Sequence, residues 1–90
     1  MDAARIFDEI AAHYHGRMQQ PGYWVPYGDY VIFVYGCQSP ADWSVRCRNR
    51  IVAKGGAGTA HGAWLGACDA IAHDLAEIRA VEAMLDEAAA

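Results

Sequence analysis

Residues 43–54 read Trp-Ser-Val-Arg-Cys-Arg-Asn-Arg-Ile-Val-Ala-Lys, and this stretch decides which fold the chain can adopt. Two sets of side chains alternate along it: Trp43, Val45, Cys47, Asn49 and Ile51 form one set, and Ser44, Arg46, Arg48, Arg50 and Val52 form the other. Successive side chains of a β-strand point to opposite faces of the sheet. The period of two therefore predicts one half-buried strand from Trp43 to Lys54.

A second apolar segment, residues 30–35, precedes this strand and reads YVIFVY. Apolar residues at every position are typical of a central strand that is covered on both faces. Residues 38–42 are expected to form the turn that lets the two strands pair antiparallel. Because two strands alone are marginal in water, a third strand from residues 23–27, or a partner chain, is expected to complete the sheet.

A helix is predicted on the N-terminal side of the sheet, over residues 3–18. Ile6, Ile10 and Tyr14 recur every four residues, which gives the helix one apolar face. Asp2 can cap its first turn, and the Pro21-Gly22 pair ends it, because proline lacks the amide hydrogen that a helix needs.

A long helix is predicted on the C-terminal side of the sheet. Gly55-Gly56-Ala57-Gly58 should break the strand, Thr59 can cap the following helix, and no proline occurs after it. One apolar stripe, expected to pack on the sheet, comprises Trp64, Cys68, Ile71, Leu75, Ile78, Val81 and Leu85. The sequence thus predicts a single α+β domain over residues 1–90: an N-terminal helix, a two- to three-stranded antiparallel sheet and a long C-terminal helix packed on the sheet.

Composition indicates a folded protein of a reducing cytoplasm. No segment approaches the length of a membrane-spanning helix, and three cysteines, Cys37, Cys47 and Cys68, cannot complete a disulfide framework. The formal net charge of −4 is segregated: residues 30–58 carry one acid and four bases, whereas residues 59–90 carry six acids and one arginine. This balance disfavours direct nucleic-acid binding and favours a protein partner, although a local basic stripe could still meet an acidic one.

The candidate catalytic patterns are weak. Lys54 precedes the glycines, whereas a phosphate-binding loop has its lysine after them, so a plain strand-to-helix turn is the better interpretation. Cys68 lies in the apolar stripe and His73 on the opposite side of the same helix, which indicates a buried thiol without a base. No histidine or cysteine pair has the spacing of a zinc site. We therefore expect no catalytic residue, no metal and no cofactor.

Two charged surfaces are candidate partner-binding sites. On one strand face Arg46, Arg48 and Arg50 would lie about 7 Å apart, which suits docking of carboxylates or phosphates but is also what a solvated sheet face looks like. The outer side of the last helix carries acids that could imitate a run of phosphates or simply be solvated; they are Asp69, Glu77 and Glu87.

The aromatic segment that contains Tyr23, Trp24 and Tyr27 is a third candidate. Tyrosine and tryptophan are frequent in binding hot spots, yet a thin core also needs large side chains. Both interpretations remain open.

As a whole, the chain resembles the small phage-encoded anti-CRISPR inhibitors in size, acidity and layout: a leading helix, an aromatic hairpin and a terminal acidic helix. The resemblance implies a non-enzymatic inhibitor that binds a CRISPR–Cas effector. It would either occupy the DNA-binding track with acidic groups, Asp74 among them, or block nuclease recruitment through the arginines and aromatics. The alternative is a small accessory or antitoxin-like module that forms a homodimer through its sheet and binds an acidic ligand with the arginine-lined strand.

Overall fold

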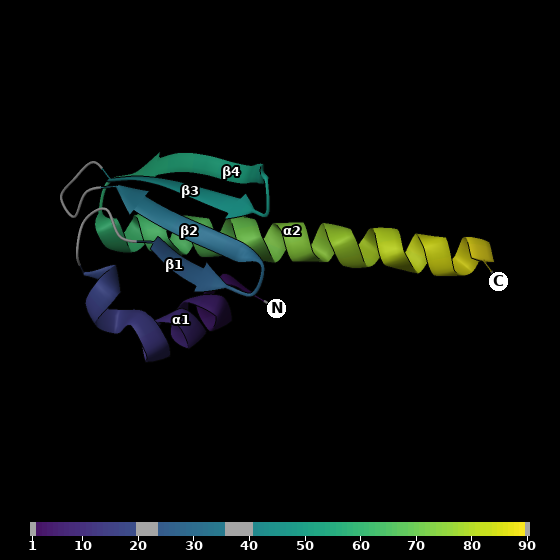
Figure 1. Cartoon of the computed structure of the whole chain (residues 1–90), viewed down its shortest axis with the longest axis horizontal. Coiled ribbons are helices and arrows are strands. Elements are labelled where there is room, and N and C mark those ends of the chain that lie inside the picture. The colour runs from purple at the N-terminus through teal and green to yellow at the C-terminus, as the bar shows by residue number, and fades with distance from the viewer. Residues whose placement is uncertain (1, 20–23, 36–40, 90) are drawn as a thin grey trace.

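The computed structural model describes residues 2–19, 24–35 and 41–89 and has the α+β architecture expected from the sequence (Figure 1). The elements in chain order are α1 (Ala3–Met18), β1 (Trp24–Tyr27), β2 (Tyr30–Tyr35), β3 (Ala41–Cys47), β4 (Arg50–Ala57) and α2 (Ala60–Ala89). The strands form one four-stranded antiparallel sheet in the order β1-β2-β3-β4. α2 contacts β2, β3, β4 and α1, and α1 also contacts β1.

The helices begin where the sequence indicates. The Asp2 carboxylate accepts a hydrogen bond from the Arg5 amide at 2.9 Å, and the Thr59 hydroxyl accepts one from the Gly62 amide at 3.0 Å. Both contacts satisfy amides of a first helical turn, which have no partner inside the helix. The prediction of α1 over residues 3–18 is confirmed, whereas Pro21 and Gly22 lie outside the described residues.

The prediction of one strand from Trp43 to Lys54 is wrong, because the chain reverses at Arg48 and Asn49. Cys47 pairs with Arg50, so only two residues connect β3 to β4, and Arg48 takes a φ of +57°. Two-residue connections between antiparallel strands commonly need a positive φ. With β1 confirmed as an edge strand, the sheet therefore has four strands instead of two or three. β3 also begins at Ala41, inside the segment predicted as a turn.

The predicted glycine turn is also misplaced, since Gly55 and Gly56 belong to β4. The Trp43 ring lies against Gly55 of β4 and Gly66 of α2. A Cβ at Gly55 would lie 2.9 Å from Cζ2 of that ring, and a Cβ at Gly66 would lie 2.9 Å from its Nε1. The two glycines leave the space in which the indole fits between strand and helix.

The core lies between the sheet and the two helices. Its fully buried side chains come from α1, three strands and α2: Ile6, Ile10, Val25, Ile32, Val45, Cys68 and Ile71. The indole Nε1 of Trp64 donates a hydrogen bond to the Met18 carbonyl at 3.1 Å, which ties α2 to the end of α1. β2 is an inner strand, as predicted, but only one of its faces is covered: Ile32 and Val34 are buried, whereas Tyr35 is exposed.

Only the first half of α2 packs on the sheet, which corrects the prediction of one continuous packed stripe. Figure 1 shows α2 running out beyond the strands, and the molecule measures 51 × 23 × 21 Å. Trp64, Cys68 and Ile71 are buried, whereas Ile78 and Leu85 of the same stripe are exposed. Within the described residues, α2 and α1 both lack the combination of length and hydrophobicity needed to cross a bilayer.

Adding a methyl group at Gly66 should destabilise the fold. Alanine has a higher helix propensity than glycine, so at a helical position with no close neighbours a Gly→Ala change would stabilise the fold by up to about 1 kcal/mol. At Gly66 the added methyl group must displace the Trp43 indole. We therefore expect Gly66→Ala to lower the free energy of unfolding by about 1–3 kcal/mol, as measured by urea denaturation. Gly16→Ala in α1 is the matched control, since nothing lies within 4 Å of the added Cβ. Equal effects of the two variants would contradict the packing of Trp43.

Candidate functional site

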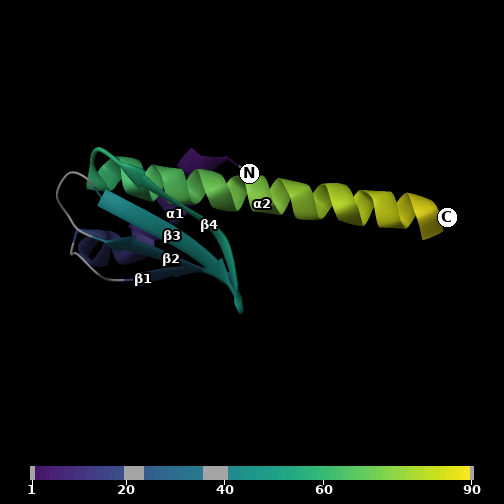
Figure 2. The same ribbon diagram turned by 90° about the horizontal axis from the view of Figure 1, so that it is seen from above.

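The uncovered face of the sheet is the first candidate surface. Outward-pointing residues of β1 and β2 include Trp24, Phe33 and Tyr35, of which Trp24 and Tyr35 are about half exposed. The rings of Phe33 and Tyr35 stack with 6.0 Å between centroids and 6° between planes. Figure 2 shows α2 on the other side of the strands from this face. Aromatic surface is therefore presented to solvent on a rigid support.

Basic side chains share this face with the aromatic ones. Arg46 of β3 pairs with Ile51 of β4, and Ser44 pairs with Lys54, so these residues point outward together. They border a shallow hollow of about 560 Å³, which is lined by Tyr35, Asp42, Trp43, Ser44, Arg46, Ile51, Lys54 and Gly55. The hydroxyls of Tyr35 and Ser44 lie 3.4 Å apart at its edge.

Arg17 adds a third cation at the edge of the sheet. Its guanidinium carbon lies 5.5 Å from the Trp24 ring centroid and 5.3 Å from that of Tyr14. Nη1 of Arg17 also donates a long hydrogen bond, 3.5 Å, to the Trp24 carbonyl. Cation–π contacts with the Tyr14 and Trp24 rings therefore position the Arg17 guanidinium beside β1.

The predicted strip of three arginines does not exist, because the reversal at residues 48–49 separates them. Arg46 points outward from β3. Arg48 lies in the turn, 3.7 Å from Asp29, with both side chains exposed. Arg50 turns to the helix-covered side and pairs with Asp74 of α2 at 3.2 Å. Of the three arginines, only Arg46 belongs to the uncovered sheet face.

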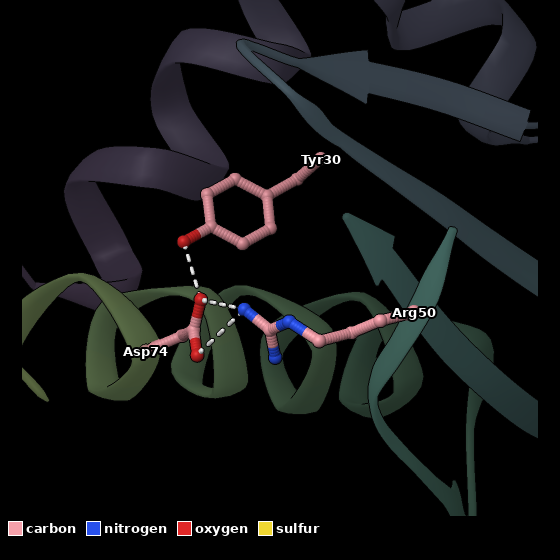
Figure 3. A network of polar contacts seen from close by, with 3 residues as sticks. All are labelled: Tyr30, Arg50 and Asp74. Carbon is pink, nitrogen blue, oxygen red and sulfur yellow. Dashed lines mark hydrogen bonds and ion pairs between the residues drawn. The ribbon is translucent and has the colours of Figure 1, made fainter. Parts of the chain in front are cut away.

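Asp74 is the centre of a contact that sequence reasoning missed (Figure 3). The Tyr30 hydroxyl donates a hydrogen bond to its Oδ2 at 2.6 Å, and Nη2 of Arg50 donates to the same oxygen at 3.2 Å. The Asp74 side chain is only 12% exposed. Burial and the neighbouring carboxylate raise the pKa of Tyr30, so its hydroxyl stays protonated and keeps donating. The network fastens α2 to β2 and β4, which removes Asp74 from the acids available to a partner.

The remaining predicted residues are scattered. Asp69 lies 3.6 Å from His73 on the exposed side of α2, and Glu77 and Glu87 are exposed farther along the helix. Tyr27 lies on the helix-covered side, where burial and a hydrogen bond to Glu9 raise its pKa. Tyr23 lies outside the described residues. Of the described residues among these, the structure brings none together with the uncovered sheet face.

The structure gives Cys68 none of the features of an activated nucleophile. Cys68 is fully buried, and that burial raises the pKa of its thiol to about 12, so the nucleophilic thiolate does not form at neutral pH. His61 lies against Phe7, with ring centroids 5.1 Å apart. Among residues 2–19, 24–35 and 41–89, no three histidine, cysteine or acidic side chains gather as metal ligands.

Replacing Asp74 should cost far more stability than replacing Asp69. Asp74→Ala leaves the buried Tyr30 hydroxyl and Arg50 without their acceptor, and we expect a loss of about 1–3 kcal/mol in the free energy of unfolding. Asp69→Ala removes only an exposed pair and should change stability by less than about 0.5 kcal/mol. Urea denaturation measures both, and similar losses would contradict a structural role of the network.

The buried thiol predicts alkaline destabilisation. The pKa of the Cys68 thiol rises from 9.0 in the unfolded chain to about 12 in the folded protein. Between these two values only the unfolded chain releases the proton. Folding is therefore favoured in full below pH 9, and this contribution to stability is lost as pH rises towards 12. In this window the free energy of unfolding should fall by up to about 1.4 kcal/mol per pH unit from this group. Between pH 9 and 10, the free energy of unfolding of Cys68→Ala, measured by denaturation, should fall less steeply with pH than that of the unaltered chain. Cys47→Ala, which keeps Cys68, should retain the slope of the unaltered chain. An unchanged slope in Cys68→Ala would show that another group is responsible.

Comparison of the chain with protein-family models, characterised proteins and solved structures finds no match.

Proposed function

We propose that the protein is a non-enzymatic inhibitor that docks the uncovered face of its sheet onto an acidic surface of a protein partner. The observation that carries the proposal is the joint presence of exposed aromatic and unpaired basic side chains on this face. No described residue of the chain covers them.

The aromatic part of the face supplies contact area. A sheet face that is exposed to water is usually polar, yet here Trp24, Tyr35 and Ile51 are each about half exposed. Tryptophan, tyrosine and arginine are the residues most enriched in binding hot spots. Because strands hold these side chains, little conformational freedom would be lost on docking.

The charged part of the face selects an acidic partner. In the part of the chain that the structure describes, Arg48 and Arg50 have carboxylate partners, whereas Arg46 and Lys54 form no ion pair. The latter two cations are therefore free to bind carboxylates of another molecule. With a net charge of −4, the chain lacks the long-range attraction that binding to an extended phosphate backbone requires, so a local cluster of carboxylates on a protein is favoured over a nucleic acid.

The resemblance to anti-CRISPR inhibitors suggests a CRISPR–Cas effector as this partner. Of the two mechanisms it implies, the sheet face supports the blocking of a protein-docking surface by aromatic and basic groups. Phosphate mimicry has less support, because Asp74 is engaged in the fold and Asp69 pairs with His73.

Reversing the charge of Arg46 tests the proposal. Against purified CRISPR effector complexes, Arg46→Glu should weaken binding by about tenfold or more, since it places a carboxylate against the acidic surface of the partner. Arg5→Glu is the matched control: it makes the same charge change in the first turn of α1, where a carboxylate is tolerated. Calorimetry measures both affinities.

Two outcomes contradict this proposal. The docking face is wrong if Arg46→Glu binds as well as the unaltered chain while Asp69→Lys and Glu77→Lys abolish binding. The partner class is wrong if the unaltered chain binds no effector.

A further inference from the structure

The two edges of the sheet differ in how they are protected. β1 is four residues long, contains Pro26 and is contacted by α1, and Nη1 of Arg17 bonds to its Trp24 carbonyl. Short length, proline and a covering helix keep an edge strand from pairing with another chain. β4, at the other edge, is eight residues long and contains no proline, and no described element pairs with its outer side. In Figure 1, β4 forms the upper border of the sheet.

The backbone of β4 presents hydrogen-bonding groups on this open side. Cys47 and Arg50 flank a two-residue turn, and residues in those positions exchange hydrogen bonds with each other. In an antiparallel sheet, the residues of one strand whose side chains share a face also direct their backbone groups to the same side. Gly55 shares the helix-covered face with Arg50, so its amide points to β3. Lys54 and Gly56 have the opposite orientation, and their amides and carbonyls point away from β3.

Positive charge lies beside the open edge. Lys54 of β4 and Arg46 of β3 project from the uncovered face, and neither forms an ion pair within the part of the chain that the structure describes. β3 and β4 contain one acid, Asp42, which projects from the same face beside Gly56. The cations therefore exceed the acids on this part of the face. Opposite charges on adjacent strands attract, so a carboxylate on an added strand would be stabilised across from Lys54.

We infer that β4 binds an extended acidic segment of a partner protein, which adds a further strand to the sheet. The backbone groups of Lys54 and Gly56 hold the segment, and its carboxylates meet Lys54 and, one strand farther in, Arg46. The acidic character of the segment rests on the proposed function, whereas the strand pairing rests on the open edge of β4 itself.

A second copy of this chain is a poorer occupant of the same edge. Pairing of two β4 strands about a two-fold axis would place Lys54 and Arg46 of both copies on one continuous face. Like charges on neighbouring strands are destabilising, and a lysine on an edge strand is a common protection against self-association. A carboxylate opposite Lys54 makes the same side chain attractive. Charge therefore favours a segment of opposite sign over another β4.

The stretch of β4 that is suited to this pairing is short. Residues 53–57 pair with β3 in regular register, whereas a register shift between Val45 and Arg46 interrupts the ladder before Ala53. Ala53 and Ala57 face the helix side of the sheet yet stay partly exposed. An added strand would cover them with every second side chain. We therefore expect a segment of about five residues in which acidic and apolar side chains alternate.

Hydrogen exchange of the full chain with a synthetic peptide tests the inference. The probe is a short peptide of alternating glutamate and valine with blocked ends, and its control has lysine in place of glutamate. In the free chain the Lys54 and Gly56 amides should exchange about tenfold or more faster than the Gly55 amide, which bonds to β3. The glutamate peptide should slow exchange at Lys54 and Gly56 by about tenfold or more, and the lysine peptide should not.

Two variants at one position separate the backbone contact from the charge. Lys54→Ala removes the charge alone, whereas Lys54→Pro also removes the outward amide, and proline is tolerated where an edge amide faces solvent. In calorimetry, Lys54→Pro should bind the glutamate peptide about tenfold more weakly than Lys54→Ala, because one hydrogen bond is lost. Circular dichroism shows whether both variants keep the fold. The exchange experiment on the unaltered chain decides the matter if Lys54→Pro does not.

The outcomes that overturn the inference are distinct from those that overturn the proposed function. The added strand is wrong if Lys54 and Gly56 are as protected as Gly55 in the free chain, if the glutamate peptide leaves their exchange unchanged, or if Lys54→Pro binds it as well as Lys54→Ala. Equal effects of the two peptides would contradict the acidic character of the segment. Protection that appears only as the free chain is concentrated would assign the edge to a second copy.

Binding to an effector separates the two proposals. If an effector binds, and Arg46→Glu weakens it while Lys54 and Gly56 still exchange rapidly in the complex, the sheet face docks without an added strand. The inference then fails and the proposed function stands. If the glutamate peptide protects Lys54 and Gly56 while no effector binds, the inference stands and the proposed partner is wrong.

Discussion

The reversal of the chain at Arg48 and Asn49 determines where the charges of the middle segment lie. It sends β4 back along β3, so that Arg46 points outward while Arg50 meets Asp74 on the helix side. A continuous strand would have left three like charges close together on one face. The turn instead gives each arginine a separate environment: an uncovered sheet face, an exposed turn and a partly buried ion pair.

The same reversal sets the fit between sheet and helix. Because β4 runs antiparallel beside β3, Gly55 comes to lie opposite Trp43, and the missing side chain admits the indole. Gly66 of α2 provides the matching space from the other side. Gly55, which the sequence predicts to break the strand, is therefore a packing residue, as is Gly66, and the large ring they accommodate helps to fill the thin core of a small domain.

The parts of this fold that depend on local sequence could be predicted, and those that depend on distant contacts could not. Asp2 and Thr59 act on neighbouring amides, and the spacing of Ile6 and Ile10 is a property of one helix, so the helix starts follow from the sequence. The Asp74 network joins residues 44 positions apart, and a helix pattern carries no sign that Asp74 faces a strand. The period of two also continues across a two-residue turn without interruption, which concealed the fourth strand.

The apolar stripe of α2 shows the same limit, because its period does not reveal how much of it the sheet can cover. The sheet ends near Leu75 while the apolar pattern continues for three more turns, and the excess creates a surface that is separate from the sheet face. Ile78 and Leu85 of this surface stay exposed, whereas Ile71, seven residues before Ile78 on the same side of α2, is buried in the core.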